Sequence, residues 1–112
     1  MNAQNQADPH AELRATVLAE MFLGLGKEAT EERVGYYLRL IGKTDPGLLR
    51  DACDAAVLAR PDDWVPGPGE VMRHVRRLVG ERREEARARE LLEYRENTRR
   101  QVVAERAGGA AS

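Results

Sequence analysis

The chain has 112 residues, of which 42% are hydrophobic and 33% charged, and its formal net charge is −1. This length suits one small domain with one modest core rather than two independent domains. The near-neutral charge excludes a polycation that holds nucleic acid by bulk electrostatics, so any contact with DNA is expected to be local and weak.

The N-terminal part of the sequence predicts a loose tail and then a helix. Residues 1–9 are polar and show no periodicity, which is typical of a flexible tail. From His10, apolar residues recur at three- and four-residue steps until Gly24 and Gly26 end the pattern, which predicts an amphipathic helix. Its expected apolar stripe consists of Leu13, Val17, Leu18, Met21, Phe22 and Leu25.

Two more helices have recognisable start and stop signals. Thr30 is a preferred N-cap residue, and the two glutamates after it favour the positive end of the helix dipole. This second helix is expected to end at Gly42. The third begins at Asp45 and Pro46, a cap followed by proline at the first helical position, and Pro61 ends it. The expected core residues of both helices are Val34, Tyr37, Leu38, Ile41, Leu48, Leu49, Ala52, Cys53, Ala56 and Val57.

A proline-rich joint leads from the third helix to a fourth. It contains Pro61, Pro66 and Pro68 together with the only tryptophan of the chain, Trp64. We expect the Trp64 ring to pack over the bundle at the entry to the fourth helix, as a hydrophobic staple does. The fourth helix opens at Pro68 or Gly69, and its inward stripe is expected to be Val71, Met72, Val75, Leu78 and Val79.

The segment after Gly80 is helix-prone and highly charged, with many Glu and Arg residues three or four positions apart. Successive helical residues are rotated by about 100°, so a straight helix through Gly80 turns its later apolar residues away from the core stripe. Leu91, Tyr94 and Val102 are therefore expected to face solvent or a partner. We interpret 81–107 as a charged, partner-binding arm.

The predicted fold is all-α, a small bundle of about four helices whose last helix extends into a charged C-terminal helix or arm. The expected divisions are a bundle domain over 10–80, the arm over 81–107 and a disordered tail over 108–112. The sequence has no apolar run of ~18 residues and no signal-peptide pattern, so we expect a cytoplasmic protein that does not enter a membrane.

The sequence contains no catalytic constellation, and we expect neither an enzyme nor a cofactor or metal site. The two histidines lack metal-ligand spacing, and no glycine-rich phosphate loop follows a strand. Cys53 is the only cysteine, so it cannot form an intramolecular disulfide. Its place on an apolar stripe predicts a buried small hydrophobe rather than a nucleophile.

Arginines gather on one face of the predicted fourth helix, away from its core stripe. A solvated charged face, balanced by nearby glutamates, is one interpretation, and a contact surface for phosphates or an acidic protein is the other. No base-reading motif accompanies these residues. The arginines are Arg73, Arg76, Arg77, Arg83 and Arg87.

The order of these features resembles the small helical domain of phage replicative-helicase loaders. The matching parts are Thr30 to Ile41, Asp45 to Val57, and Trp64, Pro66, Glu70 and Val71 in the joint. The resemblance covers about Leu13 to Val79. It implies a phage or prophage DNA-replication accessory protein that binds a hexameric DnaB-type helicase and loads or inhibits it. It also implies that the segment after Gly80 is the main helicase contact and that an origin-bound replisome organiser is a further partner.

Two other functions stay open at this point. One is a nucleic-acid-binding module that uses the arginine face. The other is a self-associating regulatory protein with a helix-pairing seam formed by Leu91, Leu92, Tyr94, Val102 and Val103. This seam lacks a sustained heptad, so a long stable coiled coil is not expected.

Overall fold

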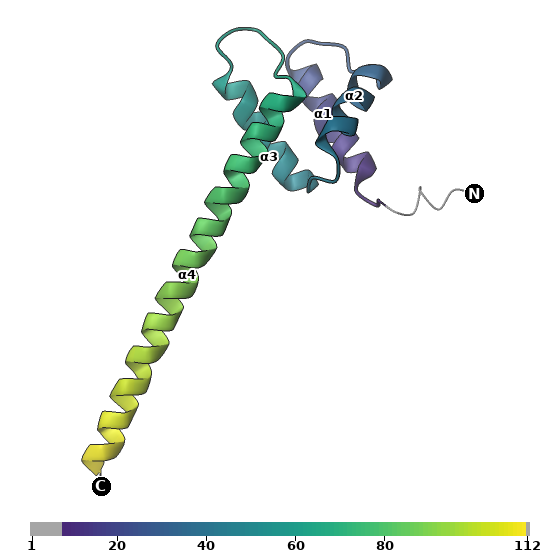
Figure 1. Ribbon diagram of the computed structural model, residues 1–112. Helices are drawn as coiled ribbons and strands as arrows, with labels where there is room; N and C mark the ends of the chain where they lie inside the picture. The colour runs from purple at the N-terminus through teal and green to yellow at the C-terminus, as the bar shows by residue number, and fades with distance from the viewer. Residues whose placement is uncertain (1–7, 112) are drawn as a thin grey trace. The chain divides into compact units, whose positions relative to one another are not determined.

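The computed structural model describes residues 8–111, and this part of the chain forms four α-helices and no strand (Figure 1). The helices are α1 (Ala11–Gly24), α2 (Glu31–Ile41), α3 (Pro46–Ala59) and α4 (Pro68–Ala111). The predicted all-α fold class, with a long last helix, is thereby confirmed. The chain divides into two compact units, Met1–Leu78 and Val79–Ser112, so α4 contributes its first turns to one unit and the remainder to the other.

The predicted helix boundaries have the expected capping contacts. The Thr30 hydroxyl accepts a hydrogen bond from the Arg33 backbone N–H at 3.1 Å, and the Asp45 carboxylate accepts one from Leu48 N–H at 3.0 Å. Each bond satisfies a backbone donor that the first turn of a helix leaves without an intrahelical partner. At the other end of α2, Gly42 has φ +68°, a backbone conformation that residues with a Cβ rarely adopt.

The core of the first unit draws apolar side chains from all four helices. The rings of Phe22 and Tyr37 meet edge to face with their centroids 5.0 Å apart, an arrangement that aromatic pairs favour. Every buried apolar side chain of the core lies on a stripe that the sequence predicts. They are Val17, Leu18, Met21, Phe22, Tyr37, Ile41, Leu49, Ala52, Cys53, Ala56, Val71 and Val75.

The first turn of α1 differs from the prediction. Leu13 was expected in the core but is 52% exposed, whereas Arg14 is 3% exposed. The Arg14 guanidinium donates a hydrogen bond to the Thr44 carbonyl oxygen at 3.0 Å and forms an ion pair with the Asp8 carboxylate. These partners offset the cost of removing a charge from water. Asp8 therefore belongs to the folded part, while residues 1–7 of the predicted tail lie outside the described residues.

The joint between α3 and α4 also differs from the prediction. Trp64 is 75% exposed, so the expectation that its ring packs over the bundle is wrong. Pro66 is buried instead, and its carbonyl oxygen accepts a 2.7 Å hydrogen bond from the Tyr37 hydroxyl. The Trp64 carbonyl accepts a 3.3 Å bond from Arg60. Backbone carbonyls, and not the indole ring, therefore connect the joint to α2 and to Arg60, the residue after α3.

The second unit consists of the rest of α4, which continues through Gly80 without interruption. Most of its described side chains are exposed, and Glu96 and Arg100, one turn apart, form a 2.9 Å ion pair of the kind that supports an isolated helix. The helix reaches Ala111, and the predicted division of the chain at 80 and 107 stays a prediction. Residue 112 lies outside the described part.

Candidate functional site

The Val79–Ser112 unit exposes large apolar side chains along a single helix. Scattered apolar residues are normal on protein surfaces, but a row of them on one helix face is what a partner's groove binds. The three apolar residues that the sequence proposes for partner binding are among them. The exposed fractions are 50% for Leu91, 63% for Leu92, 69% for Tyr94, 41% for Val102 and 61% for Val103.

The helical geometry sorts these side chains into two groups. At about 100° per residue, Leu91, Thr98 and Val102 lie within about 40° of one another, and Tyr94 lies next to them. We call these four residues the arm stripe. Leu92 and Val103 lie about 100–120° away from Leu91 and form a second, shorter row. The arm stripe thus supplies anchors at i, i+3, i+7 and i+11, the spacing of a helix that binds in a groove.

The predicted arginine face is divided between the two units. In the first unit, Arg73 forms a 3.0 Å ion pair with Glu70, and a side-chain nitrogen of Arg77 lies 3.1 Å from His74 Nδ1. Arg76, between them, is exposed. The carboxylate of Glu70 offsets the charge of Arg73, which lowers the positive potential that this part of α4 presents to phosphates.

The remaining two arginines of that face, Arg83 and Arg87, lie in the second unit and are exposed. The second unit as a whole has eight arginines and seven glutamates. Because these charges nearly balance, the unit attracts neither an acidic nor a basic partner strongly by net charge. The apolar stripe is therefore the more specific feature of its surface.

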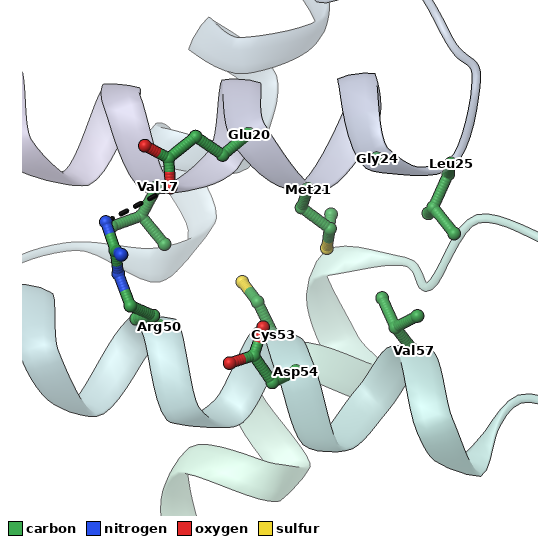
Figure 2. A pocket seen from close by; sticks show the side chains of 9 residues that line it. All are labelled: Val17, Glu20, Met21, Gly24, Leu25, Arg50, Cys53, Asp54 and Val57. Atoms are coloured by element: carbon green, nitrogen blue, oxygen red, sulfur yellow. Dashed lines mark ion pairs between the residues drawn. The ribbon is translucent and has the colours of Figure 1, made fainter.

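A cavity between α1 and α3 is a feature that the sequence did not reveal. It has a volume of about 250 Å³, and Figure 2 shows Met21 and Cys53 pointing toward each other across it. Glu20 and Arg50 form a 3.1 Å ion pair at its edge, with both side chains 55% exposed. Apolar periodicity indicates which helix faces turn inward, but it carries no signal for how completely two facing helices fill the space between them.

The reactivity of this cavity depends on whether the Cys53 thiol is protonated. The residue is 2% exposed, and burial, followed by the nearby Asp54 carboxylate, raises the pKa of its thiol to about 12. The thiol is therefore protonated at neutral pH and is a poor nucleophile. The prediction of a buried small hydrophobe at this position is confirmed.

The described residues give no sign of two other kinds of site. Within 8–111, no group of three or more His, Cys, Asp or Glu side chains is arranged to hold a metal ion. None of the helices in this part of the chain is long and apolar enough to cross a membrane. Comparisons of the chain with protein-family models, with curated proteins and with solved structures found no match.

Proposed function

We propose that this chain is a protein-binding adaptor, in which the first unit is a folded platform and the second unit supplies the contact with a partner. The observation that carries the proposal is the exposure of the arm stripe on a helix segment that is rich in arginine and glutamate. Leucine, tyrosine and valine at helical spacing are suitable anchors for a hydrophobic groove.

The partner that we propose is a hexameric replicative helicase of the DnaB type. Support comes from the sequence resemblance to phage helicase loaders, which rests on the Thr30 and Asp45 helix starts and on the joint before α4. The chain would then act as a phage or prophage DNA-replication accessory protein that loads or inhibits the helicase. An origin-bound replisome organiser would be the second partner.

Such an adaptor needs no catalytic group. Its effect on the helicase comes from differential affinity, because a ligand that binds one conformation more tightly shifts the population toward that conformation. Release follows when another partner competes for the same surface. The exposed anchors of the arm stripe suit this role, since a contact with a few anchors can be both specific and reversible.

The proposal is tested with the full chain and the purified replicative helicase of the host. We expect the double variant Leu91→Glu with Val102→Glu to lose binding by at least tenfold, because each substitution places a carboxylate where an apolar side chain would be buried. Truncation after Gly80 is expected to abolish binding. The matched control is Leu58→Glu, which changes an 87% exposed leucine of the first unit.

The outcomes test the contact surface and the identity of the partner separately. If the truncated chain binds as well as the full chain, the second unit is not the contact. If neither the full chain nor the control variant binds, the helicase is not the partner. Binding to DNA that weakens steeply with salt, and that is lost when Arg73, Arg76 and Arg77 are changed to Glu, would assign the function to the arginines instead.

A further inference from the structure

We infer that the second unit also pairs with the second unit of another copy of this chain, in an antiparallel arrangement, through the arm stripe. This inference concerns the chain alone and does not depend on the identity of its partner. The starting observation is that Leu91 and Val102 are 50% and 41% exposed on a helix with its own intrahelical ion pair. An identical helix turned end for end presents the same anchors, so the contact closes with twofold symmetry.

Leu91, Thr98 and Val102 of the arm stripe lie in a short seam with alternating four- and three-residue steps. Such spacing keeps seven positions on one side of the helix, which is the requirement for pairing with another helix. Only Ala88, Leu91 and Val102 of its seven residues are apolar, so the apolar contact is small and the pairing is expected to be reversible. The seam consists of Glu84, Ala88, Leu91, Arg95, Thr98, Val102 and Glu105.

The charges in this seam decide between the two directions of pairing. In a parallel, in-register pair every seam residue meets its own copy, so Glu84 faces Glu84, Arg95 faces Arg95 and Glu105 faces Glu105. Like charges brought together at the centre of an interface are destabilising. A parallel pair would therefore place three repulsive layers among the seven.

One antiparallel register avoids these repulsive layers. When the two helices are aligned so that Leu91 faces Val102 of the second copy, Arg95 faces Thr98 and Glu105 faces Ala88 of the second copy. Next to the seam, Glu85 lies opposite Arg106 of the second copy, which is an attractive charge pair. Twofold symmetry repeats each contact, so the interface has two apolar layers and two such charge pairs.

The intrahelical ion pair of the second unit is compatible with antiparallel pairing. Glu96 and Arg100, whose side chains form the 2.9 Å ion pair, lie on the side of the helix opposite Leu91. Pairing through the arm stripe therefore leaves that ion pair intact. Antiparallel pairing thus covers the exposed anchors of the arm stripe without breaking an observed interaction of the second unit.

The first experiment measures self-association of the full chain by sedimentation from micromolar to millimolar concentration. We expect a reversible monomer–dimer equilibrium that Val102→Glu shifts at least tenfold toward the monomer, while Leu58→Glu leaves it unchanged. Glu85→Arg alone and Arg106→Glu alone should each weaken pairing roughly tenfold, because each turns both charge pairs repulsive. The double variant, in which the two charges are exchanged, should restore it.

The second experiment tests the direction of pairing by disulfide cross-linking. Variants Leu91→Cys and Val102→Cys are mixed and oxidised mildly, and the products are identified by mass. Antiparallel pairing predicts the mixed disulfide, whereas each variant alone should cross-link poorly. Unsubstituted chain is the control, since the only native thiol, Cys53, is 2% exposed.

Two results would overturn the inference. A monomer at every concentration would exclude pairing altogether. Efficient cross-linking of Leu91→Cys with itself, at the expense of the mixed product, would show a parallel pair. Both experiments contain no helicase, so their failure leaves the proposed function untouched, and failure of helicase binding leaves the pairing untouched.

Discussion

Arg14 is the one charged residue in the core of the first unit among the described residues. Its partners come from both sides of α1 in the sequence, the Asp8 carboxylate before the helix and the Thr44 carbonyl after α2. The side chain therefore joins the beginning of the described chain to the loop between α2 and α3. A buried guanidinium with both partners in place is stable, but removal of the guanidinium leaves the partners without compensation.

Arg14→Ala is accordingly expected to lower the free energy of unfolding by about 2 kcal/mol. Leu13→Ala, which alters the exposed neighbour, should change it by less than about 0.5 kcal/mol. Urea unfolding followed by circular dichroism measures both. A larger loss for Leu13→Ala than for Arg14→Ala would show that the predicted stripe through Leu13, and not the observed one, describes the folded protein.

The thiol of Cys53 gives the protein a dependence on alkaline pH. Its pKa is about 12 in the folded state against an ordinary value of 9.0, so between these values the unfolded chain loses a proton that the folded chain keeps. The stability that this one group contributes is therefore fully present below pH 9 and is lost as the pH rises toward 12. Burial also raises the pKa of Tyr37 above its ordinary value of 10.0, which acts in the same direction above pH 10.

We expect the free energy of unfolding to fall above pH 9 with a slope that approaches about 1.4 kcal/mol per pH unit for the thiol alone. Cys53→Ala should be less stable at neutral pH but should show a shallower decline between pH 9 and pH 10. Denaturant titrations at a series of pH values provide the measurement. An unchanged slope in the variant would mean that the thiol is not the titrating group.

At the scale of helices, one glycine lies within α2 and another directly follows it, and their roles are opposite. Gly42 ends the helix with φ +68°, where a Cβ is strained although no atom lies within 4 Å of the position it would take. Gly35 lies within the helix, is exposed, and also has open space around the position of a Cβ. The two positions therefore differ in backbone conformation and not in crowding.

Gly42→Ala is expected to destabilise the protein by about 1 kcal/mol, because alanine resists the left-handed conformation. Gly35→Ala should instead stabilise it by up to about 1 kcal/mol, since alanine has the higher helix propensity. Thermal or denaturant unfolding of the two variants compares them directly. Changes of the same sign would contradict the backbone explanation.

Helix-scale features were predictable from the sequence because they depend on local rules. The Thr30 and Asp45 starts follow from capping, and the burial of residues such as Phe22 and Leu49 follows from helical periodicity. The burial of Arg14 was not predictable, because a polar residue enters a core only when distant partners are available. Neither Asp8 nor Thr44 is part of a local pattern.

The two regions that carry the functional argument were predictable to different degrees. The exposure of Leu91 and Val102 agrees with the expectation, but almost every described side chain after Gly80 is exposed whichever way it faces, so helical phase does not decide it. Trp64 lies in a joint whose sequence has no apolar periodicity. Its position depends on which backbone carbonyls of the joint, such as that of Pro66, accept hydrogen bonds. The cavity between α1 and α3 depends on helix packing, for which the sequence pattern has no signal.

At the scale of the whole chain, the two proposals use the same surface. A Leu91 side chain that is buried against a second copy cannot at the same time occupy a groove of the helicase. If both proposals hold, pairing and helicase binding exclude each other on a given chain, and the pair would dissociate when the helicase is present.

This competition predicts that the apparent affinity of the chain for the helicase falls as the total chain concentration enters the range in which pairs form. The variant Glu85→Arg, which weakens pairing, should bind the helicase without this decline. Titrations of labelled helicase at several chain concentrations measure the effect. A constant affinity across the pairing range would show that the two contacts use different residues.

The exposed position of Trp64 determines which spectroscopic signal reports the unfolding of this protein. An indole that is 75% exposed in the folded state meets nearly the same solvent after unfolding, so the emission of the only tryptophan changes little when the bundle melts. Fluorescence would therefore understate folding, and circular dichroism at helical wavelengths is the informative signal. The same indole becomes a selective reporter of anything that covers the joint between α3 and α4, at a site that the arm stripe does not include.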